Sequence, residues 1–377
     1  MRVQLKLKSF KKTVDLVDYA NYKVAGEEKE AINTPAILVL AEGDKTFLVA
    51  LNREMYMKMP IPGTVVYEEG SVALDSSSLK KMLKAISDEN IELNFTEGDD
   101  KVKIISGEDT NEMTTLNLVK FKKLPAFEEK RKLCDVVAGV LSNSIKSVAS
   151  AIPSKAQQIA LNSCCVEFGM NCISFVGFDG YKLIKYDLQM EDGYNLDFYE
   201  KILIPTEAAD ALVRTLAKGT SLVSMSFCDN NGKKYLVIEK ENIVVAIRLR
   251  DYKYPDYDSL LRSDYDFTFV VDQSSLKDTI ASIAGIGSAK EALPVHFIFD
   301  GSKVTLRFVT QDSTIAKTLA IESMEGEPER FRMLAKSLKE VLPYLEARIR
   351  IKVFKNGLVI ITPESSNSYI LVTRTLD

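Results

Sequence analysis

The chain has 377 residues and a formal net charge of −4, with 46% hydrophobic and 27% charged residues. This length exceeds one ordinary core, so two or three domains are expected. No apolar run approaches the roughly 18 residues that span a bilayer, and the N-terminus has no secretion signal. We therefore expect a cytoplasmic protein without a membrane partner.

One order of elements is predicted three times along the chain. Amphipathic helices are expected over 9–25, 131–152 and 272–289, and each is followed by strand-like sequence. A second helix is predicted in each third, within 73–86, 203–216 and 330–345. Alternating residues interrupted by Gly and Asn turn clusters then indicate antiparallel strands. We predict an α+β fold of three tandem domains, 1–124, 125–254 and 255–377, each with two helices packed on antiparallel sheets.

A hairpin is predicted in the middle third, between Ser174 and Leu188. Asp179-Gly180 separates two apolar strand-like runs, which favours a two-residue turn with positive φ at both central positions. The turn does not explain why Phe178, Tyr181, Lys182 and Leu183 gather at its tip. The tip is either an ordinary β-corner or a binding surface.

Basic residues outnumber acidic ones on the predicted helices, although the whole chain is acidic. One interpretation is a set of ordinary solvated helix faces. The other is that the helices share one side of the molecule and offer weak, sequence-independent contacts to phosphates. The candidate phosphate-facing residues are Lys11, Lys12, Lys80, Lys81, Lys84, Lys146, Arg214, Lys218, Lys277 and Lys336.

Catalytic and metal-binding patterns are missing from the sequence. His296 is the single histidine, and the five cysteines form no CxxC pair, which is typical of reduced buried thiols. There is no HExxH, P-loop or GxGxxG motif. We therefore predict no catalytic residue, no metal site and no cofactor, although an enzyme whose carboxylate metal cluster cannot be located from the sequence stays an alternative.

Three features together resemble the bacterial β sliding clamp, the processivity subunit of DNA polymerase III. They are "FVGFDGYKL" around the hairpin, "IRLRDYKYPDYDSLL" at 247–261, and the triplicated unit with "LIPTEAADALVRTL". The resemblance implies a non-catalytic, head-to-tail homodimer that closes into a ring around duplex DNA without sequence preference. An edge strand near Glu112–Leu118 would pair with the third domain, with Leu116, Leu118 and Ile286 at the interface.

The resemblance also implies a groove that binds short peptide motifs of DNA polymerase and the clamp loader. The matching positions are Phe178, Gly180, Tyr181, Lys182, Leu183, Pro255, Ser259, Leu260, Ile370, Val372, Thr373, Arg374 and Leu376. The chain departs from the family pattern at Phe178, at Ser259 and in its last residues, "TRTLD". The groove should therefore differ in shape and charge. A clamp-fold scaffold that binds partners without closing on DNA, or a divergent second clamp, stays open.

Overall fold

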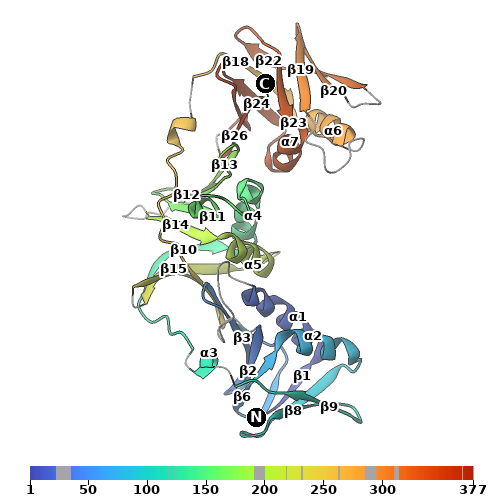
Figure 1. Ribbon diagram of the computed structural model, residues 1–377, viewed down its shortest axis with the longest axis vertical. Coiled ribbons are helices and arrows are strands. Elements are labelled where there is room, and N and C mark those ends of the chain that lie inside the picture. The colour runs from blue at the N-terminus through green and yellow to red at the C-terminus, as the bar shows by residue number, and fades with distance from the viewer. Residues whose placement is uncertain are drawn as a thin grey trace. The chain divides into compact units, whose positions relative to one another are not determined.

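The computed structural model describes residues 1–22, 35–117, 119–122, 124–190, 200–217, 219–230, 232–261, 264–284, 294–309, 314–366 and 368–376. It divides into two compact units, which we name unit 1 (Met1–Asn143 and Glu207–Arg250) and unit 2 (Ser144–Thr206 and Asp251–Asp377). In the described residues the order strand, helix, run of strands, helix and three strands occurs three times (Figure 1). The α+β class is confirmed. The domain limits after residues 124 and 254 stay predictions, because each unit joins strands from both sides of one limit.

Unit 1 contains two antiparallel sheets. The first has the order β5 (Val65–Glu68), β1 (Arg2–Lys6), β7 (Asn90–Asn94), β8 (Lys101–Ser106) and β9 (Asp109–Thr114). The second has the order β10 (Lys130–Val137), β15 (Leu222–Asn230), β16 (Lys233–Lys240), β17 (Ile243–Arg248), β4 (Met55–Pro60), β3 (Lys45–Leu51), β2 (Ala36–Glu42) and β6 (Gly70–Asp75). The pairing of β17 with β4 makes this sheet continuous across the predicted first domain limit.

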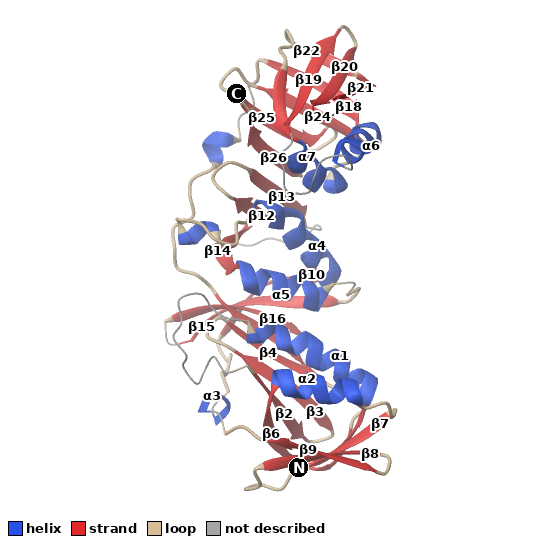
Figure 2. Cartoon of the chain, turned by 45° about the vertical axis from the view of Figure 1, so that its right-hand side comes forward, coloured by secondary structure: helices blue, strands red, loops and turns tan. Residues whose placement is uncertain are grey.

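Amphipathic helices cover the second sheet of unit 1. In α1 (Leu7–Val17) the buried residues recur at helical spacing, among them Phe10, Val14 and Val17, so one apolar stripe faces the strands. Helix α2 (Ser76–Ala85) starts where Asp75 Oδ1 accepts a hydrogen bond of 2.7 Å from Ser78 N, because this cap satisfies an orphan backbone donor. Figure 2 shows α1 and α2 side by side over β2, β3 and β4.

A connecting segment packs on the same eight-stranded sheet. It includes α3 (Val119–Lys122), and its side chains Leu116, Phe121, Leu124 and Phe127 lie against a buried cluster around Val49. Its Lys120 ammonium is buried and donates a 3.1 Å hydrogen bond to the Leu51 carbonyl.

Unit 2 also contains two antiparallel sheets. The larger has the order β14 (Glu200–Pro205), β11 (Ser163–Phe168), β12 (Cys172–Phe178), β13 (Leu183–Gln189), β26 (Tyr369–Arg374), β25 (Leu358–Pro363), β24 (Arg348–Val353), β18 (Phe267–Asp272) and β22 (Ser323–Glu325). The smaller has the order β21 (Thr314–Ala320), β20 (Lys303–Val309), β19 (Pro294–Asp300) and β23 (Phe331–Leu334). Phenylalanines join the two sheets, with the Phe269 ring of β18 and the Phe299 ring of β19 at 5.1 Å between centroids.

The remaining helices start within the predicted ranges, and α4 begins seven residues later than predicted. They are α4 (Ala138–Val148), α5 (Thr206–Leu216), α6 (Gln273–Ala284) and α7 (Ala335–Val341). The helical prediction over 131–137 is wrong, since these residues form β10. A short apolar run does not distinguish a strand from a helix, and sheet pairing decides this case. The chain crosses between the units within α4 and at the start of α5. Residues 23–25 and 285–289 of two predicted helices lie outside the described residues.

Candidate functional site

The hairpin tip in unit 2 is a four-residue loop. Phe178 pairs with Leu183, so Asp179–Lys182 form the connection, closed by Asp179 N donating to Lys182 O at 3.1 Å. Asp179 Oδ1 accepts hydrogen bonds from Tyr181 N (2.9 Å) and Lys182 N (2.6 Å). The predicted two-residue turn is therefore wrong. Only Gly180 has a positive φ, +92°, because the aspartate side chain replaces backbone bonds of the tighter turn.

One cross-strand row carries the apolar residues predicted from the hairpin and the C-terminal strand. Phe178 lies opposite Leu183, Leu183 opposite Val372, and Val372 opposite Ile360. The row thus crosses β12, β13, β26 and β25. Because opposite side chains on one face of a sheet lie within contact distance, the pairing of β13 with β26 brings together residues that are far apart in the sequence.

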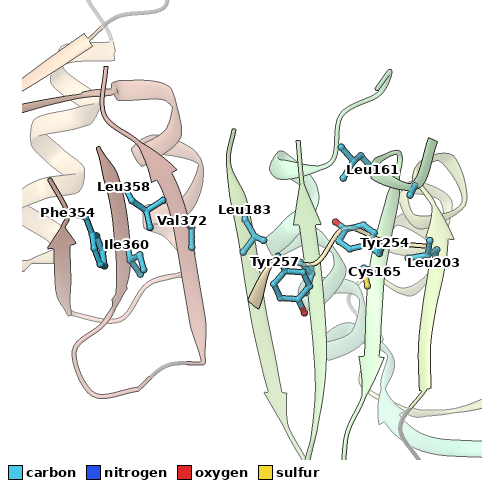
Figure 3. Close-up of a cluster of buried hydrophobic side chains, with 12 residues drawn as sticks. Leu161, Cys165, Leu183, Leu203, Tyr254, Tyr257, Phe354, Leu358, Ile360 and Val372 are labelled. Atoms are coloured by element: carbon cyan, nitrogen blue, oxygen red, sulfur yellow. The ribbon is translucent and has the colours of Figure 1, made fainter. Parts of the chain in front are cut away.

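The segment that precedes β18 covers this row. Figure 3 shows Leu183, Val372, Ile360 and Phe354 in one cluster with Tyr254 and Tyr257 from this segment. Both tyrosines are buried, at 4% and 2% exposure. Sequence reasoning chose Pro255 between them and missed the two tyrosines. Their position on either side of Pro255-Asp256 in an otherwise polar stretch was the available signal.

A cavity of about 140 Å³ opens at the edge of this cluster. Its lining residues are Ser259, Leu260, Asn356, Leu358 and Arg374. Three of them were predicted. Asn356 and Leu358 were missed because they lie at the turn between β24 and β25, which comes beside the cavity only through the pairing of β25 with β26. Leu260 is half-buried and packs on the cluster with Phe178 and Ile370. The cavity therefore has an apolar base and a polar rim.

The Lys182 side chain forms an ion pair and is largely buried. Its Nζ lies 2.6 Å from Glu340 Oε2 of α7, and the two side chains are 11% and 24% exposed. Glu340 also lies 3.9 Å from Lys336 Nζ, whose side chain is 83% exposed. The Lys182 ammonium is thus neutralised by a carboxylate of α7.

The other predicted groove residues are placed less uniformly. Tyr181 is 82% exposed at the hairpin tip, beside the exposed Gly180. Thr373 alternates with Val372 along β26 and therefore lies on the opposite face of the strand. Leu376 is half-buried, and its backbone N–H donates to the Arg332 carbonyl at 2.9 Å. A separate cavity of about 410 Å³, lined by charged residues such as Asp266, contains none of the predicted residues.

Comparisons with known proteins find similarity to bacterial sliding clamps. Residues 27–125 match the family model for the N-terminal domain of the DNA polymerase III beta subunit. A beta sliding clamp of Chlamydia pneumoniae is 19% identical over 242 residues, 64% of this chain and 63% of that protein. One from Helicobacter pylori strain J99 is 21% identical over 247 residues, 65% of this chain and 63% of that protein. The chain is thus similar in sequence to bacterial β sliding clamps, at about one fifth identity.

The fold agrees over the whole length with a solved β sliding clamp. The DNA polymerase sliding clamp from Bacillus subtilis gives a TM-score of 0.88 at 16% identity and covers 100% of this chain and 99% of that one. The matched segments span only 63% of the length of the two sequence relatives. Sequence similarity to the sliding clamps is thus confined to part of the chain, while the shared fold extends over all of it.

The cations predicted to face DNA in this sliding-clamp relative fall into two groups. Two are engaged within the protein, since Lys80 Nζ lies 2.6 Å from Asp18 Oδ2 and Lys11 Nζ donates to the Ile86 carbonyl at 3.2 Å. The Arg214 guanidinium lies 5.2 Å from the centroid of the Tyr19 ring and is exposed. The remaining described cations are exposed on α1, α2, α4, α6 and α7: Lys12, Lys81, Lys84, Lys146, Lys277 and Lys336. Lys218 lies outside the described residues.

The predicted interface residues are only partly described. Leu118 and Ile286 lie outside the described residues. Leu116 is half-buried and packs on the core of unit 1, with its N–H donating to the Ala73 carbonyl at 2.8 Å. Within the described residues, β9 is an edge of its sheet in unit 1 and β21 an edge of its sheet in unit 2.

Reactive groups are few in the described part of the chain. Burial raises the pKa of Cys134 and of Cys164 to about 12, which disfavours a thiolate. No three His, Cys, Asp or Glu side chains among the described residues are grouped so that they could hold a metal. None of the described helices is long and apolar enough to cross a membrane.

Proposed function

We propose that two copies of this chain close into a ring around duplex DNA, without sequence preference, and that the groove of unit 2 tethers DNA polymerase and the clamp loader. The chain has no catalytic role and uses no cofactor in this account, and it works in the cytoplasm. The observation that carries the proposal is the cavity beside Leu260, built over a buried apolar row in a chain with the sliding-clamp fold.

The shape of the cavity fits one anchoring side chain of a short peptide. An apolar cavity of about 150 Å³ holds a group the size of benzene, and the cavity here has about 140 Å³. Peptide recognition usually relies on a few anchors in desolvated pockets. Because Lys182 is already paired with Glu340, leucine or aromatic side chains should dominate binding, with little dependence on salt.

Ring closure would use the two edge strands. A strand edge with unpaired backbone groups is a template for another chain, and β9 and β21 are such edges on different units. Pairing β9 of one copy with β21 of another is a heterologous contact. Such contacts form a ring when the rotation that relates successive copies brings the last copy back to the first. Two such contacts give a dimeric ring, and light scattering tests the dimer directly.

Sliding would use the exposed lysines of the helices. Each phosphate contact of this kind is individually weak, sensitive to salt and blind to sequence. A closed ring needs no tight contact, since its topology prevents escape. The acidic net charge of the whole chain then disfavours binding of nucleic acid to the other surfaces of the protein.

A peptide-binding assay tests the groove. The probe is a short fluorescein-labelled peptide with adjacent leucine and phenylalanine residues, followed by fluorescence anisotropy. Leu260→Asp should abolish binding, because it places a charge at the apolar base of the cavity. Tyr252→Asp is the matched control, since Tyr252 lies in the same connecting segment, is 53% exposed and is absent from the cluster. Equal binding by both variants would contradict the proposal.

A further inference from the structure

The outer face of the four-stranded sheet in unit 2 carries an unusual row of basic side chains. On β19 the residues of one face, such as Val295 and Phe297, are buried, while Ile298 on the other face is 38% exposed. Strand alternation places His296 on the exposed face with Ile298. In the described part of the chain this face is therefore accessible to another molecule. Figure 2 shows this sheet, formed by β19, β20 and β21, near α6.

The row is fixed by the strand register. Arg332 lies opposite His296 on one side, and Arg307 lies opposite His296 on the other. Directly opposite side chains have Cβ atoms about 4.5–5.5 Å apart, and like charges placed there are destabilising. Two guanidinium groups thus flank one imidazole across three adjacent strands.

The other rows of the same face are matched. Thr305 and Thr318 lie opposite each other and share a hydrogen bond of 3.0 Å. Asp300 lies opposite Lys303, which places opposite charges together. The Arg332–His296–Arg307 row is the exception, because neither arginine has an ion pair with an acidic side chain of the described residues.

The arginines of this row affect the pKa of the histidine between them. Partial burial lowers the pKa of His296, and the charges of Arg332, Arg307 and Arg330 lower it further. The imidazole is therefore neutral at physiological pH, and the arginines dominate the charge of the face. An arrangement of cations without counter-charge is stabilised when a ligand supplies the missing anions.

We propose that this face docks an acidic segment of a partner protein, with carboxylates on Arg307 and Arg332. The guanidinium fork matches a carboxylate bidentately, and the flat sheet face leaves both arginines open to approach. The site is separate from the groove, whose residues lie on the larger sheet and the connecting segment.

The apolar neighbours of the row favour a protein segment over nucleic acid. Ile298 is 38% exposed and Val309 is 47% exposed, and both lie on the face that carries Arg307. Aliphatic side chains gain from burial against apolar side chains of a peptide, whereas a phosphate backbone offers them nothing comparable. The expected segment therefore alternates acidic and apolar residues.

Fluorescence anisotropy on the full chain tests the proposal. The probe is a short labelled peptide of Asp and Glu with two leucines, and its control has Asn and Gln in place of the acids. The double variant Arg307→Ala and Arg332→Ala should weaken binding of the acidic probe by about tenfold or more. Lys303→Ala, on the same exposed face but in the matched row, should bind as the unaltered chain does.

Several results would overturn the proposal. They are equal binding by the double variant, an equal loss in Lys303→Ala, equal binding of the neutral peptide, or displacement of the acidic probe by short linear duplex DNA at the arginines. The milder single variant Arg307→Ala repeats the test if the double variant unfolds. The groove probe described above should bind every one of these variants equally, so failure here is distinguishable from failure of the groove.

Discussion

Replacing Lys182 with methionine isolates the ion pair that closes the hairpin tip onto α7. Methionine keeps the aliphatic stem but removes the ammonium that lies 2.6 Å from Glu340 Oε2. A hydrogen bond to a charged group contributes about 1.5–3 kcal/mol net, and removing one partner of a buried pair leaves a desolvated charge. Because both side chains are less than one quarter exposed, we expect Lys182→Met to lower the free energy of unfolding by about 1.5–3 kcal/mol.

Urea unfolding, followed by fluorescence of the tyrosines, measures this loss. Lys336→Met is the matched control, because Lys336 contacts the same Glu340 at 3.9 Å with an 83% exposed side chain. An exposed pair of this kind should contribute less than about 0.5 kcal/mol. A double-mutant cycle with Glu340→Gln should assign most of the loss to coupling. A cost for Lys182→Met no larger than that of Lys336→Met would refute the reasoning.

Three further predictions follow from buried or crowded groups. Burial lowers the pKa of Lys120 to about 8 from 10.5, so the folded state binds fewer protons than the unfolded state between these two pH values. The free energy of unfolding should therefore rise with pH across this window. In Lys120→Met the midpoint of urea unfolding should no longer show this rise. His296 is the single histidine, so its ring proton signal in NMR needs no assignment. The pKa of His296 should lie below 6.5 and increase in Arg332→Ala. An unchanged pKa would contradict the placement of Arg332 opposite His296. Gly177→Ala should destabilise the chain by about 1–3 kcal/mol, because its Cβ would lie 2.5 Å from the Val148 carbonyl oxygen; an unchanged Tm would show that the strand can move.

Local sequence patterning explains why four of the residues predicted for the groove lie together in one apolar cluster. Phe178 and Leu183 flank a turn, and Ile370 and Val372 alternate along a strand, so local patterning places each pair on one face. Register then needed only the pairing of β13 with β26. The loop length at Asp179 was wrong because a side-chain acceptor substituted for backbone geometry.

Other features depend on contacts that no local pattern records. The pair of Lys182 with Glu340 joins residues 158 positions apart. Strand β10 was predicted as helical because its apolar content suits either structure, and its pairing with β15 decides the outcome. The arginine row became visible only with the register of β19, since Arg307 and Arg332 are unremarkable in sequence.

Retention on circular DNA tests the central claim, encirclement, most directly. The chain is loaded onto a nicked circular duplex with its clamp loader, and the complex is isolated by gel filtration before and after a single restriction cut. The account predicts retention on the circle and loss after linearisation, because a ring slides off free ends. Equal retention on both forms would show ordinary electrostatic binding and contradict the account.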